Sequence, residues 1–296
     1  MRPLFVLVTG ATGKQGGSVV RALLDYGHRV RGLTRKPDSE KAMLLEEEGV
    51  EIVEGDFNDP DSIKKAMKDV DAVFLMGTSF EEGIEAEVRH GITVADIAKE
   101  ESLKHLVYTS VSSANENTGV PHFESKFKIE EHIREIGIPF TIIRPVSFME
   151  NYIAPWTLPK LKEGLINGPL SPEKKSQLIA VKDIGRFALY VFENRAQFLG
   201  KAIDIASDEV SGNEISELFT HALGHKVSYH QQDTETLKTR GEEILKMYKW
   251  VKDVGYDVNI EKLRSEFPKI GWTRFNDWVN EQDWNALNQP VEKAIT

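Results

Sequence analysis

The segment from Val6 to Gly17 constrains the fold of this chain more than any other part of the sequence. It reads VLVTGATGKQGG, an apolar strand pattern that runs into glycines at positions 10, 13 and 16 and then into a helical pattern. Gly10 permits a sharp turn, Gly13 removes a Cβ from the path of a pyrophosphate, and Gly16 lets the helix pack closely on the sheet. Backbone N–H groups at the helix start, together with the helix dipole, attract phosphate. The segment therefore predicts a dinucleotide site rather than a glycine turn without a ligand.

Strand and helix patterns alternate through the first half of the chain. This alternation predicts an α/β fold with a Rossmann-type doubly wound parallel sheet. Ligands bind at the carboxyl ends of the strands in such sheets, so we expect the functional residues directly after each strand. The predicted strands are 4–9, 29–34, 50–53, 72–76, 106–110 and 140–144.

The second half of the chain is less regular, and its pattern predicts a smaller, mostly helical C-terminal lobe. We expect a dinucleotide-binding domain over 1–152, with a return of the chain to the main sheet over 176–206. In that return, a strand at 178–181 precedes a helix that we expect Asp183 to cap. The remainder of 153–296 is the predicted substrate or partner lobe. Its aromatic side chains are expected to form its core, with a ligand cage or a roof over the cleft as the alternative for some of them: Tyr248, Trp250, Tyr256, Phe267, Trp272, Phe275 and Trp278.

The end of the second predicted strand indicates which dinucleotide binds. Most NAD sites place a carboxylate there, but this strand ends Leu33-Thr34-Arg35-Lys36. A guanidinium at that place pairs bidentately with a 2′-phosphate, so Arg35, helped by Lys36, predicts NADP(H) over NAD(H). The alternative is a solvated surface pair. After the next two strands, the residues placed to border the adenine and to pass under the nicotinamide ribose are Asp56, Phe57, Gly77 and Thr78.

Composition limits the classes of function that remain. The 296 residues are 40% hydrophobic and 28% charged, as in an ordinary globular protein, and no apolar run predicts a transmembrane helix or a signal sequence. The chain has no cysteine, which excludes disulfides and thiolate chemistry, and its net charge of −10 opposes binding to nucleic acid or an anionic membrane. We expect a cytoplasmic protein. His221 and His225 have metal-like spacing but no glutamate after the first histidine, so no metal site is predicted.

Several further motifs carry a resemblance to a known family. They are EVRHG at 87–91, HFESK at 122–126, RPVSFMEN at 144–151, and MYKW at 247–250 with GYD at 255–257. With the glycine segment, LTR at 33–35 and GD at 55–56, they resemble the NmrA-like family of atypical short-chain dehydrogenase/reductases. The resemblance implies an NADP(H)-binding Rossmann domain, a small C-terminal lobe and a cleft between them. It implies cofactor contacts from Gly10, Ala11, Thr12, Gly13, Lys14, Gln15, Arg35, Asp56, Phe57, Gly77, Thr78, Arg89, Lys126, Phe148, Met149, Glu150 and Asn151.

The catalytic residues of short-chain reductases are only partly present. These enzymes use Tyr-x-x-x-Lys on one helix face, where the lysine holds the ribose and the phenol supplies a proton. Here the lysine is Lys126, but His122 stands where the tyrosine would be. His122 is either a proton donor of shorter reach or a pocket or surface residue. Lys126 is either the ribose ligand or an exposed helix lysine. The serine partner is unassigned, because Ser110 and Ser112 bracket the usual place and Val111 lies between them.

Two functions of different class fit this sequence. The first is an NADPH-dependent oxidoreductase of a quinone or other small electrophile, because hydride addition gives a hydroquinone anion that water can protonate. The second is a redox sensor, in which NADP(H) occupancy orders loops at 78–83 and 113–121 and alters a protein-binding face. Direct DNA binding is not expected, since no basic stripe appears. We expect the enzyme, and the sequence makes no prediction of the oligomeric state.

Overall fold

The structure is a computed structural model that describes residues 2–77 and 79–284, which form two compact units. The first unit contains the chain up to 146 together with 181–205 and 261–271. The second contains 147–180, 206–260 and the described residues from 272 onward. Both units are therefore assembled from stretches that lie far apart in the sequence.

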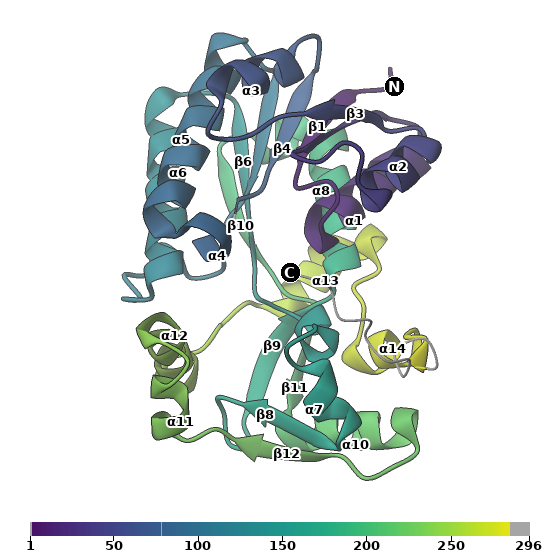
Figure 1. The fold of residues 1–296 in the computed structure, drawn as a ribbon, viewed down its shortest axis with the longest axis vertical. Helices are drawn as coiled ribbons and strands as arrows, with labels where there is room; N and C mark the ends of the chain where they lie inside the picture. Colours follow the sequence, from purple (N-terminus) through teal and green to yellow (C-terminus); the bar gives the residue numbers. More distant parts are fainter. Residues whose placement is uncertain (1, 78, 285–296) are drawn as a thin grey trace. The chain divides into compact units, whose positions relative to one another are not determined.

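A parallel seven-stranded sheet forms the centre of the first unit (Figure 1). The chain order reverses at the first strand, which lies between the second and the fourth, so ligands of such a sheet are expected at its carboxyl end. The prediction of a doubly wound parallel sheet is confirmed. Across the sheet the order is β10 (Lys201–Ile205), β6 (Phe140–Pro145), β5 (His105–Thr109), β4 (Ala72–Leu75), β1 (Phe5–Thr9), β2 (Arg29–Thr34) and β3 (Glu51–Glu54).

Helices cover both faces of this sheet (Figure 1). One face carries α1 (Lys14–Asp25), α2 (Glu40–Glu47) and α8 (Val181–Glu193), and the other carries α3 (Pro60–Met67), α5 (Ile84–Glu100) and α6 (Pro121–Ile136). Every residue of β1, β4, β5 and β6 is buried between these layers. The unit also contains the short helices α4 (Ser79–Glu82), α9 (Arg195–Phe198), α13 (Ile260–Glu266, from residue 261) and η2 (Pro268–Ile270).

Local sequence signals explain where several helices begin and end. The Asp59 carboxylate accepts the Ser62 N–H at 3.4 Å and Pro60 stands in the first turn of α3, as a helix start requires. At the other end of a helix, Gly137 caps α6 with a φ of +69°. Gly185 lets α8 pack closely on α1, because a Cβ at this position would lie only 2.4 Å from the Ser18 carbonyl oxygen of α1. These local features set the start of α3, the end of α6 and the close packing of α8 on α1.

The second unit contains two small sheets and several helices. Its core includes Met149, Phe219, Phe275 and Trp278, so part of the predicted aromatic core is confirmed there. The three-stranded sheet is β11 (Asp208–Ser211), β9 (Lys175–Ile179) and β7 (Ser147–Phe148), and the two-stranded sheet is β12 (Ser228–Gln231) with β8 (Leu165–Gly168). The helices are η1 (Met149–Ile153), α7 (Leu158–Lys162), α10 (Gly212–Leu223), α11 (Thr234–Lys238), α12 (Glu242–Asp253) and α14 (Phe275–Asn280).

The predicted return to the main sheet is wrong in two details. The strand expected at 178–181 is β9, which pairs with β11 and β7 of the second unit, whereas β10 is the strand that joins β6. A short apolar run looks the same in either sheet, because its pairing partner is not local. Asp183 is not an N-cap either. Helix α8 begins at Val181, and the Asp183 carboxylate is fully buried in its first turn, 3.3 Å from Arg186 Nη1.

Among the described residues, no helix combines the length and the apolar composition needed to cross a membrane.

Candidate functional site

The loop between β1 and α1 has the geometry that a diphosphate site needs. Gly10 has a φ of +62°, and its carbonyl oxygen accepts the Gly13 N–H at 2.9 Å. A Cβ on Gly16 would lie 2.1 Å from that same carbonyl oxygen, so only glycine allows α1 to start so close to the loop. The N-cap residue of α1 is Gly13, which has no side chain to occupy the N–H groups of the first turn. The residues present therefore fit an anion at this helix N-terminus.

Two side chains tie this loop to the neighbouring strands. Thr9 Oγ1 accepts the Met76 N–H at 2.8 Å and donates to the Met76 carbonyl at 2.9 Å, which joins the carboxyl ends of β1 and β4. Gln15 Nε2 donates to Thr109 Oγ1 at the end of β5, at 2.6 Å. The Gln15 side chain thus bonds within the protein, and its predicted contact with a cofactor stays a prediction.

Arg35 follows β2 and forms ion pairs with both acids of α4. Its Nη2 lies 2.6 Å from Glu81 Oε2, and its Nη1 lies 3.6 Å from Glu82 Oε1. The Arg35 side chain is 52% exposed, and Lys36 beside it is exposed as well. Sequence reasoning missed these acids because Glu81 lies 46 residues from Arg35 along the chain. The sequence has no acid at the end of β2, but the fold brings the Glu81 carboxylate to Arg35.

Asn58 contacts further residues that are predicted to bind the cofactor. Its Nδ2 donates to Glu82 Oε2 at 3.0 Å, and Arg89 Nη2 lies 3.5 Å from its Oδ1. Asp56 Oδ1 accepts the Asn58 N–H at 2.8 Å, and Phe57 packs against the core of the first unit. The structure thus brings Arg35, Asp56 and Arg89 into one cluster through Asn58 and α4.

Lys126 forms a buried ion pair at the carboxyl end of β4. Its Nζ lies 2.6 Å from Glu87 Oε1 and 3.3 Å from the Gly77 carbonyl oxygen, while Ser125 Oγ donates to Glu87 Oε2 at 2.6 Å. The Glu87 side chain is fully buried and that of Lys126 is 15% exposed. Lys126 is therefore not a solvated helix lysine, and its contact with a ribose stays a prediction. Thr78 lies outside the described residues.

His122, one turn before Lys126, is buried rather than on the surface. It is 8% exposed, and its ring lies 5.7 Å from the Phe80 ring and 4.9 Å from the Phe123 ring between centroids. The imidazole therefore stands in an aromatic environment on α6. Its proton-donor role stays a prediction.

Two hydroxyls of the β5 region are buried without a hydrogen-bond partner among the described residues, Tyr108 Oη and Ser110 Oγ. Burial raises the pKa of the Tyr108 phenol well above its usual value, so the phenol stays protonated. Ser112 Oγ, in contrast, donates to Asp204 Oδ1 at 2.8 Å. Of the two serines that bracket the expected position, Ser110 has the hydroxyl left for another partner.

A second buried ion pair joins the end of β6 to the middle of α6. Arg144 Nε lies 2.8 Å from Glu130 Oε1, its Nη2 lies 2.5 Å from Glu130 Oε2, and its Nη1 donates to Asn115 Oδ1 at 2.6 Å. Burial alone lowers the pKa of Arg144, but the hydrogen bonds and charge of Glu130 outweigh burial and raise it. This pair holds the segment after β5 in place beside the predicted site.

The predicted contacts from Phe148 to Asn151 belong to the second unit. Met149 is fully buried in the core of that unit. Glu150 Oε1 accepts the Trp278 Nε1–H at 3.1 Å, and Asn151 Nδ2 lies 3.4 Å from Ser147 Oγ. Their roles toward a cofactor stay predictions.

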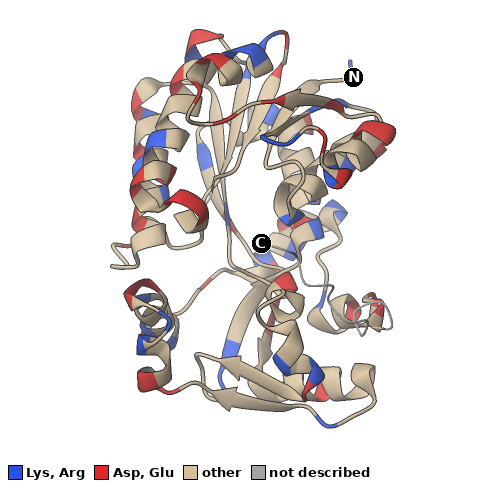
Figure 2. Cartoon of the chain, viewed as in Figure 1, with Lys and Arg blue, Asp and Glu red and all other residues tan. Residues whose placement is uncertain are grey.

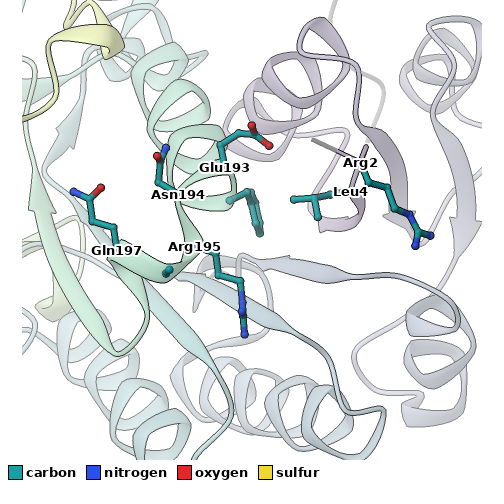
Figure 3. Close-up of a pocket in the computed structure, with 8 residues that line it drawn as sticks. Arg2, Leu4, Glu193, Asn194, Arg195 and Gln197 are labelled. Carbon is teal, nitrogen blue, oxygen red and sulfur yellow. The ribbon is translucent and has the colours of Figure 1, made fainter.

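A hollow of about 480 Å³ in the first unit lies away from the predicted site. It is lined by Arg2, Leu4 and residues 192–197, so it borders the amino end of β1 (Figure 3). The guanidinium groups of Arg2 and Arg195 lie well apart in Figure 3 and do not form a clamp for one anion. The hollow contains none of the predicted cofactor residues. Within 2–77 and 79–284, no group of three or more metal-ligating side chains is positioned to hold a metal ion.

A model of the NmrA-like family matches residues 4–279. The chain belongs to the NmrA-like family. An NmrA-like family domain-containing oxidoreductase of Malbranchea aurantiaca is 33% identical over 250 residues, which cover 76% of this chain and 74% of that protein. The predicted family is confirmed.

Solved structures of three other proteins have the same fold. The Citrobacter triphenylmethane reductase complexed with NADP(H) matches with a TM-score of 0.78 at 20% identity, covering 93% of this chain and 99% of that one. NmrA, a negative transcriptional regulator, matches with a TM-score of 0.79 at 20% identity over 95% of each chain. An Escherichia coli NADPH-dependent quinone oxidoreductase complexed with NADPH matches with a TM-score of 0.77 at 22% identity, covering 94% and 99%. At these identities the likeness shows the fold, and two of the three proteins were crystallised with the predicted cofactor.

Proposed function

We propose that this NmrA-like chain binds NADP(H) and reduces a quinone or similar small electrophile by hydride transfer. The observation that carries the proposal is the buried Lys126–Glu87 pair beside Gly77, on the carboxyl edge of the sheet that also carries the glycine loop. The uncapped start of α1 suits a diphosphate, and Arg35 suits a 2′-phosphate. The Malbranchea relative is named an oxidoreductase, and the E. coli neighbour an NADPH-dependent quinone oxidoreductase.

Lys126 is held so that one of its N–H donors is left for a ribose hydroxyl. An ammonium group has three donors, and among the described residues Glu87 and the Gly77 carbonyl take two of them. The fully buried Glu87 carboxylate is in turn fixed by Ser125. Bound NADPH would supply the hydride, and this chain of contacts would orient its nicotinamide ribose.

The proton for the reduced product need not come from the protein. His122 stands at the position where short-chain reductases usually have a tyrosine, and its ring packs between those of Phe80 and Phe123. Hydride addition to a quinone leaves a resonance-stabilised hydroquinone anion, which takes its proton from water. A quinone therefore suits this site better than a simple carbonyl, because a carbonyl gives a strongly basic alkoxide that forms readily only when a proton donor stands at its oxygen.

The test is NADPH oxidation against a panel of quinones and aldehydes. We expect turnover with quinones, and a loss of about 100-fold in Lys126→Ala because the ribose is no longer positioned. Lys128→Ala, an exposed lysine on the same helix, is the matched control and should stay within about twofold. Because Lys126→Ala leaves a buried carboxylate unpaired, Lys126→Ala/Glu87→Gln should restore stability without restoring turnover.

A redox sensor is the second candidate, favoured by the likeness to NmrA, a negative transcriptional regulator. Stoichiometric NADP(H) binding without turnover on the whole panel would support the sensor over the enzyme. Under either function the division between a nucleotide-binding unit and a substrate or partner unit stays a prediction.

A further inference from the structure

We propose that Glu81 and Glu82 occupy, in the nucleotide-free protein, the anion site that a 2′-phosphate would use, and so set the preference between NADP(H) and NAD(H). The inference rests on the proposed function, because it takes Arg35 as the phosphate ligand. Figure 2 shows acidic residues on α4, and in sequence they are its last two positions. The sequence around Arg35 gives no indication that Glu81 and Glu82 lie beside it.

The contacts between α4 and Arg35 resemble those of a bound phosphate. Arg35 Nη2 and Glu81 Oε2 are 2.6 Å apart, a charge-assisted hydrogen-bond distance, and a second carboxylate, Glu82, lies 3.6 Å from Nη1. The planar guanidinium recognises carboxylate and phosphate oxygens through the same N–H donors. A phosphate and Glu81 therefore compete for one set of donors.

Glu82, the second acid of α4, is held in place by contacts with Asn58 and His90. Glu82 Oε2 accepts the Asn58 Nδ2–H at 3.0 Å and lies 3.9 Å from His90 Nε2. His90 Nε2 is in turn 2.9 Å from Asn58 Oδ1, and its ring packs 5.6 Å from the Phe57 ring. Helix α4 is thus anchored to the segment after β3 and to α5, which keeps Glu81 at Arg35.

The two nucleotides differ in whether their binding breaks the ion pair between Arg35 and Glu81. NADP(H) must replace the Glu81 carboxylate with its 2′-phosphate, which breaks the ion pair and meets repulsion from Glu82. NAD(H) has a hydroxyl there and leaves the pair intact. The side chains of Arg35 and Glu81 are 52% and 57% exposed, so their ion pair is weak. The free energy needed to break this pair makes NADP(H) binding weaker by about twofold to fivefold than it would be without Glu81.

The experiment is calorimetric titration of NADPH and NADH into the full chain and into Glu81→Gln and Glu81→Gln/Glu82→Gln. We expect NADPH to bind about twofold to fivefold more tightly to Glu81→Gln, with a larger gain in the double variant and no change for NADH. Glu85→Gln is the control: it removes the same charge from an exposed position that makes no contact with Arg35 among the described residues. In an Arg35→Ala background, Glu81→Gln should have no effect.

Two results would overturn the inference while leaving the proposed function standing. The first is an unchanged NADPH-to-NADH affinity ratio in both variants, including an equal gain for both nucleotides that Glu85→Gln reproduces. The second is weaker NADPH binding in Glu81→Gln. Failure of the unmodified chain to bind either nucleotide would instead overturn the proposed function, and the inference with it.

Discussion

At the residue scale, His105 shows how burial fixes a protonation state. Its side chain is 1% exposed at the start of β5, and its Nε2 lies 2.8 Å from Thr141 Oγ1. The Thr141 hydroxyl donates to the Phe198 carbonyl at 2.9 Å, so it must accept from His105, and Nε2 carries the proton. Nδ1 is buried without a partner among the described residues. Burial, with a smaller contribution from the charge of Arg195, lowers the pKa of His105 to about 4.

A pH dependence of stability follows from His105. The pKa rises from about 4 in the folded chain to its ordinary 6.5 when the chain unfolds, so the unfolded state binds more protons between these values. Stability should therefore fall as the pH drops from 6.5 towards 4, by about 3 kcal/mol at most. Urea unfolding from pH 4 to 8 measures this. His105→Gln should flatten the slope below pH 6.5 and leave it unchanged above pH 7; equal slopes throughout would contradict the assignment.

Single residues also show what sequence reasoning cannot reach. Lys126 was predicted from its spacing, but its partner Glu87 lies 39 residues away, and no local pattern connects them. Arg35 was assigned to a phosphate because no acid follows its strand, yet Glu81 reaches it from α4. Ion pairs between distant segments depend on the fold, and a charge pattern along one element contains no information about them.

At the scale of elements, Gly16 sets the distance between α1 and the loop after β1. A Cβ there would lie 2.1 Å from the Gly10 carbonyl oxygen, a backbone atom that cannot rotate away. We expect Gly16→Ala to lower the free energy of unfolding by about 1–3 kcal/mol and to weaken nucleotide binding, because α1 must shift. Gly77→Ala is the matched control for stability, since among the described residues its Cβ would meet only Glu87 Cγ, at 3.9 Å. Denaturant unfolding of both variants tests this, and equal stabilities would contradict it.

Elements with a clear local pattern were predictable from the sequence, including the edge strand β3, whereas the other edge strand, β10, was not. The strands β1 to β6 match their predicted bounds within one residue at each end, because most are wholly buried and flanked by turns and helix signals. Strand β10 was missed as a strand of the main sheet. It lies at the edge, its sequence is KAIDI, and only its last residue is buried, so it lacks the apolar run of a central strand.

At the scale of the whole molecule, contacts between distant segments decide which unit a segment joins. The segment 261–271 belongs to the first unit, where Phe267 packs 5.3 Å from Phe187 and 5.8 Å from Phe198 between ring centroids. The sequence predicts Phe267 in the core of the C-terminal lobe; the residue is buried, but its assignment to that lobe is wrong because its partners lie in the first unit. The fold class can be predicted from the alternation of strand and helix patterns along the chain. Which stretches assemble into one unit depends instead on packing contacts between distant segments.

The first unit also contains the predicted nucleotide contacts from Gly10 to Lys126, so nucleotide binding should be linked to its stability. A ligand that binds only the folded state stabilises it by about 2.7 kcal/mol at 100 times its Kd. Strand amides of β1, β4 and β5 that exchange through unfolding of this unit should then exchange about 100-fold more slowly with NADPH present. At the same NADPH concentration Arg35→Ala should lose most of this protection, while Lys128→Ala keeps it. Hydrogen exchange of the strands measures the effect, and full protection in Arg35→Ala would show that the guanidinium does not hold the 2′-phosphate.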